Sequence, residues 1–331
     1  MKSQWTGFRS PLADRIEAFL FHKRALERKF WTEERALRLF DRYIVEQGIV
    51  NLDGITPEFV DAFLSSRPRT RPRSYNHLLS VLHRLFAWQV AQGHLSRSPV
   101  QARPRRTTSQ RTPFLFDVPA AKRLLEAAGR LQDNPCGPRR GPRTYPMIFA
   151  LLFGLGLRVG EVARLRRADV DLSRRLLIIR HTKFSKSRLV PMGPGLSERL
   201  TGYLEYCESV RGVLGPDAPV FSLISNRPVN PGTISQTFHH LMASMSIDLP
   251  QGVRPPRAHD LRHSFAVATL LRWYRSGLNP ADRLIHLSTF LGHVQPSSTA
   301  VYLTITAELL GEASERFERF AAPGLIGGDR S

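Results

Sequence analysis

The sequence predicts a mainly α-helical protein of two domains, with a small antiparallel β-sheet in the second (an α+β fold). Three observations support this. Apolar residues recur at helical spacing over roughly the first hundred residues, a Pro- and Arg-rich stretch interrupts that periodicity, and two short strand-like segments are later separated by a loop, as in a β-hairpin. A chain of 331 residues is also longer than one ordinary compact domain. With 42% apolar residues it can bury a sizeable core.

The N-terminal domain is expected to span residues 1–94 and to be helical. Thr56 is the predicted N-cap of a short helix, with Pro57 at its first helical position. Gly48 and Gly93 are expected to end the helices that precede them. The apolar stripe of the first helix is expected to extend from Leu12 to Phe30 and to include Leu26. The later helices are predicted at 33–47, 56–63 and 74–92.

A basic linker is expected at 95–113, followed by a second domain at 114–320 and a tail at 321–331. Residues 174–180 and 188–192 are predicted strands, and the seven residues 181–187 between them form the loop of a hairpin. Residues 146–157 form a strongly apolar segment. Helices are predicted at 118–131, 195–211, 230–245, 256–273, 280–291 and 307–320.

The net charge of +20 and the pI near 11.1 point to a polyanionic partner. Between Ala62 and Phe116 there is no Asp or Glu, whereas ten arginines occur. Arginine suits planar, bidentate contacts with phosphate. Charge alone does not separate DNA from RNA or from an acidic membrane. The arginines predicted to contact DNA are Arg69, Arg71, Arg73, Arg84, Arg103, Arg105, Arg106 and Arg111.

Several classes of protein are disfavoured. No apolar stretch approaches the length of a membrane span, and no signal peptide is apparent, so a cytoplasmic, nucleoid-associated protein without a membrane partner is expected. Cys136 and Cys207 form no Cys-x-x-Cys pair and are expected to be reduced thiols. The sequence has neither a Walker-type loop nor an acidic cluster typical of two-metal nucleases, so no cofactor and no metal are expected.

Three short segments place Arg or His in distinctive contexts: GLGLRVGEVARL at 154–165, HDLRH at 259–263 and LGHVQPSSTAVY at 291–302. With Lys183 in the predicted hairpin loop, they resemble the tyrosine recombinase (phage integrase) family. Its signature is an arginine in G-L-R-x-x-E-x-x-x-L, a hairpin lysine, H-x-L-R-H, L-G-H, and a tyrosine nine residues beyond that histidine. The chain matches every element in order, over about 145 residues. The resemblance covers 114–320 and implies the active-site set Arg158, Lys183, His259, Arg262, His293 and Tyr302.

The chemistry of these residue types agrees with the resemblance. Forked guanidiniums stabilise the charge that develops on phosphate oxygens during phosphodiester cleavage, which suits Arg158 and Arg262. The 259/262 spacing puts His259 and Arg262 on one helix face. A tyrosine needs proton removal to act as a nucleophile, and His259 is the expected acceptor for Tyr302.

Lys183 is expected to protonate the departing 5′-oxygen, and His293 to hydrogen-bond the scissile phosphate. Other interpretations stay open at single positions. Arg158 can pair with Glu161 three residues later, and Lys186 lies in the same loop as Lys183. His263 is expected to orient or pack rather than to catalyse, and Asp260 to form hydrogen bonds near the start of its helix.

By resemblance, the two domains form a clamp on double-stranded DNA, and four subunits, identical or not, act on two DNA sites. The predicted function is site-specific recombination through a 3′-phosphotyrosyl intermediate, in an integrase or transposase of a mobile element. The alternatives are a Xer-like recombinase that resolves chromosome dimers, a type IB topoisomerase, and a catalytically silent architectural DNA-binding protein. The segment 305–320 is expected to form a helix that docks on a neighbouring subunit or on its own domain.

Overall fold

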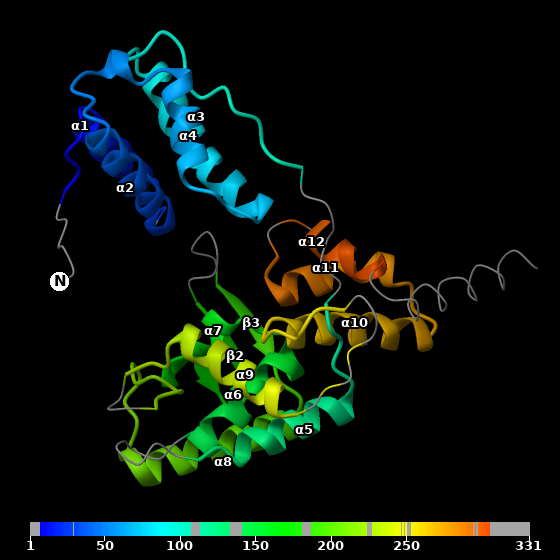
Figure 1. The fold of residues 1–331 in the computed structure, drawn as a ribbon. Helices are drawn as coiled ribbons and strands as arrows, with labels where there is room; N and C mark the ends of the chain where they lie inside the picture. The colour runs from blue at the N-terminus through cyan, green and yellow to red at the C-terminus, as the bar shows by residue number, and fades with distance from the viewer. Residues whose placement is uncertain are drawn as a thin grey trace, which may run out of the picture. The chain divides into compact units, whose positions relative to one another are not determined.

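The computed structural model describes residues 7–28, 30–106, 113–132, 141–180, 187–223, 227–245, 247, 249, 253–293, 295 and 297–304. The chain divides into two compact units, Met1–Gln110 and Arg111–Ser331 (Figure 1). Among the described helices, none combines the length and the apolar character needed to cross a membrane. Arg111, Lys183, the predicted helix at 307–320 and the tail lie outside the described residues.

The first unit is helical, as predicted. Thr56 caps α3, since its Oγ1 accepts a hydrogen bond of 3.2 Å from the backbone N–H of Phe59. Gly48 and Gly93 follow the ends of α2 and α4 with positive φ angles of 68° and 73°, a conformation that glycine adopts at little cost. The elements are α1 (Ala13–Ala25), α2 (Trp31–Glu46), the 3₁₀ helix η1 (Leu52–Gly54), α3 (Pro57–Ser66) and α4 (Pro72–Ala91).

One expectation for this unit was wrong. The stripe predicted to run from Leu12 to Phe30 is interrupted, because α1 ends at Ala25 and Leu26 is 56% exposed. Phe30 is buried as expected, but it lies in the left-handed region at the N-cap of α2. Helical spacing alone does not detect a chain reversal that returns an apolar residue to the same core.

The core of the first unit is rich in aromatic rings. The ring of Phe40 packs edge-on against the rings of Phe63 and Phe86, at centroid distances of 4.9 and 6.0 Å. Val100, from the segment predicted to be a linker, is also buried in this core, and Leu95 packs against it. Part of the predicted linker therefore packs on the first unit.

The second unit contains one small antiparallel sheet in the order β1-β2-β3. Its strands are β1 (Val170–Asp171), β2 (Leu176–Ile179) and β3 (Arg188–Pro191), and β2 pairs with β3 in the register Leu177↔Val190. The predicted hairpin strands are confirmed, although both are shorter than expected. β1 was not predicted, because two residues are too few to show an alternating pattern.

Helices make up most of the rest of this unit. Residues 146–155 of the apolar segment expected at 146–157 lie in α6 (Gly141–Leu155), whose core residues include Ile148 and Leu152, and α5, α8 and α10 all contact α6. α10 begins at Asp260, later than the predicted residue 256. The carboxylate of Asp260 accepts a 2.9 Å hydrogen bond from the backbone N–H of Arg257 and so holds the turn before the helix. The remaining elements of the unit are α5 (Val118–Gly129), α6 (Gly141–Leu155), α7 (Val159–Ala163), η2 (Arg167–Asp169), α8 (Pro194–Arg211), α9 (Pro231–Ser244), α10 (Asp260–Arg275), α11 (Pro280–Leu291), α12 (Ser297–Ala300) and η3 (Val301–Thr304).

A smaller apolar cluster joins α10, α11 and η3. Leu270 of α10, Leu291 of α11 and Tyr302 of η3 are all buried in it. Tyr302 is only 3% exposed. Packing in this cluster therefore holds the predicted nucleophile next to the helix that carries HDLRH.

Candidate active site

Four short segments of the second unit bring the predicted site residues together. Arg158 precedes α7, and His259 and Arg262 lie at the start of α10. His293 follows α11, and Tyr302 lies in η3. Side-chain contacts link these segments directly, although they are up to 144 positions apart (158 to 302) in the sequence. Lys183 lies outside the described residues.

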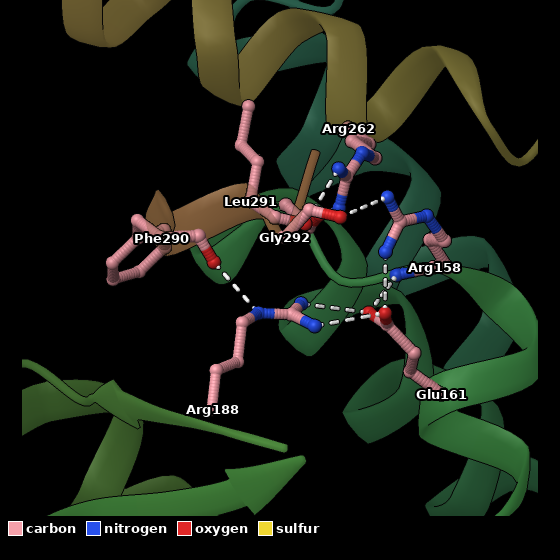
Figure 2. Close-up of polar contacts among 8 residues, drawn as sticks. Arg158, Glu161, Arg188, Arg262, Phe290, Leu291 and Gly292 are labelled. Atoms are coloured by element: carbon pink, nitrogen blue, oxygen red, sulfur yellow. Dashed lines mark hydrogen bonds and ion pairs between the residues drawn. The ribbon is translucent and has the colours of Figure 1, made fainter. Parts of the chain in front are cut away.

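The C-terminal end of α11 is the point on which the arginines converge (Figure 2). Three consecutive backbone carbonyls there each accept a hydrogen bond from a different arginine. Arg188 donates to Phe290 at 2.8 Å, Arg262 to Leu291 at 2.7 Å, and Arg158 to Gly292 at 2.7 Å. The last carbonyls of a helix lack partners within the helix, and they carry the negative end of its dipole. The three arginines provide both hydrogen-bond donors for these carbonyls and positive charge at the negative end of the dipole.

Arg262 is the most deeply buried of the three arginines, at 1% exposure. Its second Nη atom donates a 2.6 Å hydrogen bond to the carbonyl of Gly156, so the guanidinium joins the residues before α7 to the end of α11. Burial, followed by the charge of Arg158, lowers the pKa of Arg262 to about 10, which leaves it protonated at neutral pH. The side chain is therefore a fixed positive charge with a fixed orientation.

Arg158 is more open, with 33% of its side chain exposed. Its Nη1 donates a 2.6 Å hydrogen bond to Glu161, which confirms the expected pair, and its backbone N–H donates to the same carboxylate at 2.9 Å. Glu161 also accepts two hydrogen bonds from Arg188. Burial raises the pKa of Glu161, but the hydrogen bonds and charge of Arg188, with those of Arg158, outweigh burial and lower it to about 2. Glu161 is therefore ionised at neutral pH and holds both arginines.

The hydroxyl of Tyr302 lies 3.0 Å from Nδ1 of His263. His263 in turn packs edge-on against the ring of His259, with centroids 4.7 Å apart. Burial raises the pKa of Tyr302, while the positive charges of Arg262 and Arg158 act in the opposite direction. His263, which the sequence predicts to orient or pack rather than to catalyse, is thus the histidine in contact with the hydroxyl. The sequence does contain an indication of this contact, because His263 lies one helical turn after His259 and therefore on the same face of α10.

His259 and His293 complete the group of imidazoles around the tyrosine. Desolvation and neighbouring cations lower the pKa of His293 to about 4, and its Nδ1 lies 2.7 Å from Oγ1 of Thr299. Desolvation, then the charges of His263, Arg262 and Arg158, lower the pKa of His259 to about 3. Both imidazoles are neutral at neutral pH and can accept a proton or a hydrogen bond.

The site thus combines two arginines whose charge is fixed, neutral histidines and one tyrosine hydroxyl. Such a set can hold an anion and transfer a proton at its edge. Sequence comparison then decides the family: residues 122–308, more than half of the chain, match the model of the phage integrase family. The chain belongs to this family of tyrosine recombinases.

Relatives within the family extend over nearly the whole chain. A protein of Sinorhizobium fredii named as an integrase/recombinase, y4rB, is 32% identical over 311 residues, which cover 92% of this chain and 96% of the relative. The tyrosine recombinase XerC of Chlorobaculum tepidum is 24% identical over 297 residues, 84% of each chain. The chain is therefore a site-specific DNA recombinase of the tyrosine type, as its motifs predicted.

Solved structures show the same fold at low sequence identity. The integrase of the transposon Tn1549, in complex with a circular intermediate DNA, matches with a TM-score of 0.64 at 16% identity, over 95% of this chain and 100% of that one. The XerH recombinase bound to difH matches with a TM-score of 0.62 at 17% identity, over 86% and 78%. These similarities confirm the predicted two-domain, mainly helical fold with its small sheet.

Proposed function

We propose that the chain cuts and rejoins double-stranded DNA through a covalent bond between the 3′-phosphate and Tyr302. The observation that carries the proposal is the contact between the Tyr302 hydroxyl and His263, in a site where Arg158 and Arg262 are held by the same helix end. A buried tyrosine that served only for packing would not require this many cations and imidazoles around its hydroxyl.

The reaction follows from the roles of these groups. The oxygen of Tyr302 attacks phosphorus, its proton passes to a neutral imidazole, and the bond from phosphorus to the 5′-oxygen breaks. His259 remains the predicted final acceptor, with His263 in contact with the hydroxyl. Arg158 and Arg262 hold the non-bridging oxygens, whose charge grows in the transition state. His293 donates to the same phosphate, and Lys183 protonates the leaving 5′-oxygen. Attack by a second 5′-hydroxyl reverses these steps, releases Tyr302 and joins the strands.

The first unit is proposed to bind the duplex through its arginines, and contacts within that unit support this. Asn76 of α4 forms a pair of hydrogen bonds with the backbone of Arg105, at 2.8 and 2.7 Å. The guanidinium of Arg105 lies 4.0 Å from the centroid of the Tyr75 ring and donates to the carbonyl of Arg69. The segment of the chain around Arg105 is therefore held against the start of α4.

This packing brings residues 103–106 next to the arginines that precede α4. Because Arg71, Arg73, Arg103, Arg105 and Arg106 are exposed, one surface of the first unit offers several guanidiniums to phosphates. Arg69 and Arg84 are half-buried on the same unit, and Arg111 lies outside the described residues. Contacts from this surface to phosphates would provide binding affinity and fix the position of the protein along the duplex. Recognition of the DNA sequence would depend on contacts with base edges.

We further propose that the enzyme serves a mobile element and acts as a tetramer on two DNA sites. The Tn1549 transposon integrase with its DNA and a λ integrase tetramer on a Holliday junction (TM-score 0.59) support this by their fold. Resolution of chromosome dimers is a second candidate, supported by the similarity to XerH and XerC. Cytoplasmic, nucleoid-associated localisation remains a prediction.

The test begins with a randomised library of duplexes, from which the wild-type chain selects its own binding sequence. The selected duplex is then given a nick beside the candidate cleavage position, so that a short strand diffuses away after cleavage and the covalent product is trapped. Wild-type protein should form an SDS-resistant adduct, and Tyr302→Phe should bind the duplex without forming one. Tyr274→Phe, which changes a half-buried tyrosine of α10, serves as the control. An adduct with Tyr302→Phe, or tight binding by wild type with no adduct, contradicts the proposal.

A further inference from the structure

Arg188, the first residue of β3, forms three hydrogen bonds beside the proposed site, and the mechanism proposed above gives it no role. Its Nε donates a 2.8 Å hydrogen bond to the carbonyl of Phe290, and its two Nη atoms donate to the two oxygens of Glu161 at 2.9 and 2.8 Å. These two partners belong to segments 102 and 27 positions away. Figure 2 shows the guanidinium of Arg188 between Glu161 and the end of α11.

The geometry points to Arg188 as a positioning residue for DNA cleavage, which acts by holding Glu161 and the end of α11 at fixed positions. This inference rests on the function proposed above for Arg158 and Arg262. A bidentate arginine–carboxylate pair fixes both distance and plane, and a lysine cannot reproduce it. The hydrogen bond from Nε to the carbonyl of Phe290 also ties the guanidinium to α11.

Glu161 transmits the effect of Arg188 to Arg158. Each oxygen of this carboxylate accepts one hydrogen bond from Arg158 and one from Arg188. The side chain of Glu161 is only 2% exposed. Without Arg188, a buried carboxylate would keep a single cationic partner and would move or take up a proton. In either case Arg158 would lose its fixed orientation.

Arg188 also affects the site through the end of α11. Phe290, whose carbonyl binds Arg188, directly precedes the two residues whose carbonyls bind Arg262 and Arg158. His293 follows immediately. A shift of this helix end would therefore move the acceptors of both arginines and the histidine together.

Gly292 provides independent evidence that this arrangement is built closely around Arg188. Its φ is +69°, and a Cβ atom placed there would lie 2.7 Å from Nη1 of Arg188. The backbone at the end of α11 thus approaches the guanidinium as closely as a residue without a side chain allows. All three guanidinium nitrogens of Arg188 already donate, one to Phe290 and two to Glu161, and the carboxylate of Glu161 offsets its charge, so Arg188 is placed to hold these partners rather than a phosphate.

The test separates positioning from phosphate binding by measuring two quantities on the duplex selected by the wild-type chain. One is the dissociation constant and its dependence on salt, and the other is the rate of adduct formation when the protein is saturated with nicked duplex. Arg188→Gln should slow adduct formation about 100-fold and leave the dissociation constant within about twofold. Arg188→Lys should recover part of the rate, since a lysine can hold Glu161 without reaching Phe290. Arg174→Gln, a change of a hairpin arginine with 78% of its side chain exposed, should match wild type in both quantities.

A double variant tests the route through Glu161. If Arg188 acts by holding that carboxylate, Glu161→Gln and Arg188→Gln together should slow cleavage by much less than the product of the two single effects. Should Arg188→Gln be unfolded at the assay temperature, as judged by its melting temperature, Arg188→Lys replaces it both as the single variant and in the double variant with Glu161→Gln.

Three outcomes overturn the inference. The first is cleavage by Arg188→Gln at the wild-type rate, and the second is a double variant that shows the full product of the two single effects. The third is weaker binding with a salt slope reduced by about 1, which would make Arg188 a phosphate ligand. Absence of an adduct with wild-type protein would instead count against the proposed function itself.

Discussion

The Tyr302 hydroxyl and Nδ1 of His263 lie 3.0 Å apart, whereas the histidine expected to accept the proton of that tyrosine, His259, packs edge-on against the His263 ring. This arrangement gives the two histidines different expected effects. Because His263 contacts the hydroxyl directly, it fixes the orientation of the nucleophile. His259, the proposed proton acceptor, contacts the ring of His263.

Replacement of each histidine tests this division. His263→Ala should slow adduct formation about 100-fold at every pH, since it removes the group that orients the hydroxyl. His259→Ala should slow it by a similar factor and also remove the acidic limb of the pH–rate profile, because the proton acceptor is lost. His240→Ala, a change at an exposed position of α9, is the control. If His263→Ala alone removes the acidic limb, His263 is the acceptor.

Arg262→Lys should reduce the rate of adduct formation by about 100- to 1,000-fold, the range typical of losing one donor to a developing oxyanion. The physical reason is geometric, because two Nη atoms of Arg262 bind carbonyls of Gly156 and Leu291 and one ammonium cannot span both. The rate is measured by single-turnover cleavage of the nicked duplex, and the melting temperature is measured in parallel. If Arg262→Lys is folded and cleaves at the wild-type rate, the two-pronged guanidinium of Arg262 is not required for cleavage.

Gly292→Ala should impair both stability and cleavage. The left-handed φ of +69° costs a residue with a side chain about 1–2 kcal/mol, and the new Cβ would also collide with Arg188. Gly277→Ala is a matched control, because its φ is +75° but no atom lies within 4 Å of the place that a Cβ would occupy. Chemical denaturation should therefore show a loss for both variants and a larger one for Gly292→Ala. Only Gly292→Ala should slow adduct formation, and equal rates for the two would contradict the expected collision.

The free energy of unfolding should fall as the pH is lowered from about 6.5 towards 4. In the unfolded chain His293 takes up a proton near its ordinary pKa, whereas in the folded chain its pKa is lowered to about 4. Below pH 6.5 the unfolded state therefore binds more protons, and stability decreases by at most about 1.4 kcal/mol per pH unit for this group.

Denaturation of His293→Gln and wild type at pH 7.5 and 5 measures this difference. The variant should lose less stability than wild type between the two values, since other titrating groups contribute equally to both proteins. His240→Gln controls for the loss of an exposed histidine. Identical losses in wild type and His293→Gln would show that His293 is not desolvated as described.

The arginines of the first unit should contribute to DNA affinity without affecting the chemical step. Arg71→Gln and Arg103→Gln should each weaken binding at low salt and reduce the slope of log K against log salt by about 1, because one phosphate contact is lost. Cleavage at saturating DNA should stay unchanged. Arg28→Gln, at an exposed position of the same unit, should leave the slope as in wild type. An unchanged slope for Arg71→Gln would remove it from the interface.

Much of this protein follows from local sequence. Apolar periodicity, the Thr56 cap and the glycine stops determined most helices of both units, because hydrogen bonds and side-chain packing within a helix depend on residues three and four apart. The three motif segments were sufficient to predict the family, and with it the choice of Arg158, Arg262, His293 and Tyr302 as site residues.

Only the tertiary structure decided which of these groups meet. The contact of His263 with Tyr302, the carboxylate of Glu161 shared by two arginines, and the use of three successive carbonyls of α11 all join segments that are distant in sequence. Nothing local encodes such contacts, because they depend on how α11 packs against α10 and against strand β3. The sequence thus determined the residues proposed to react, and the packing determined their partners.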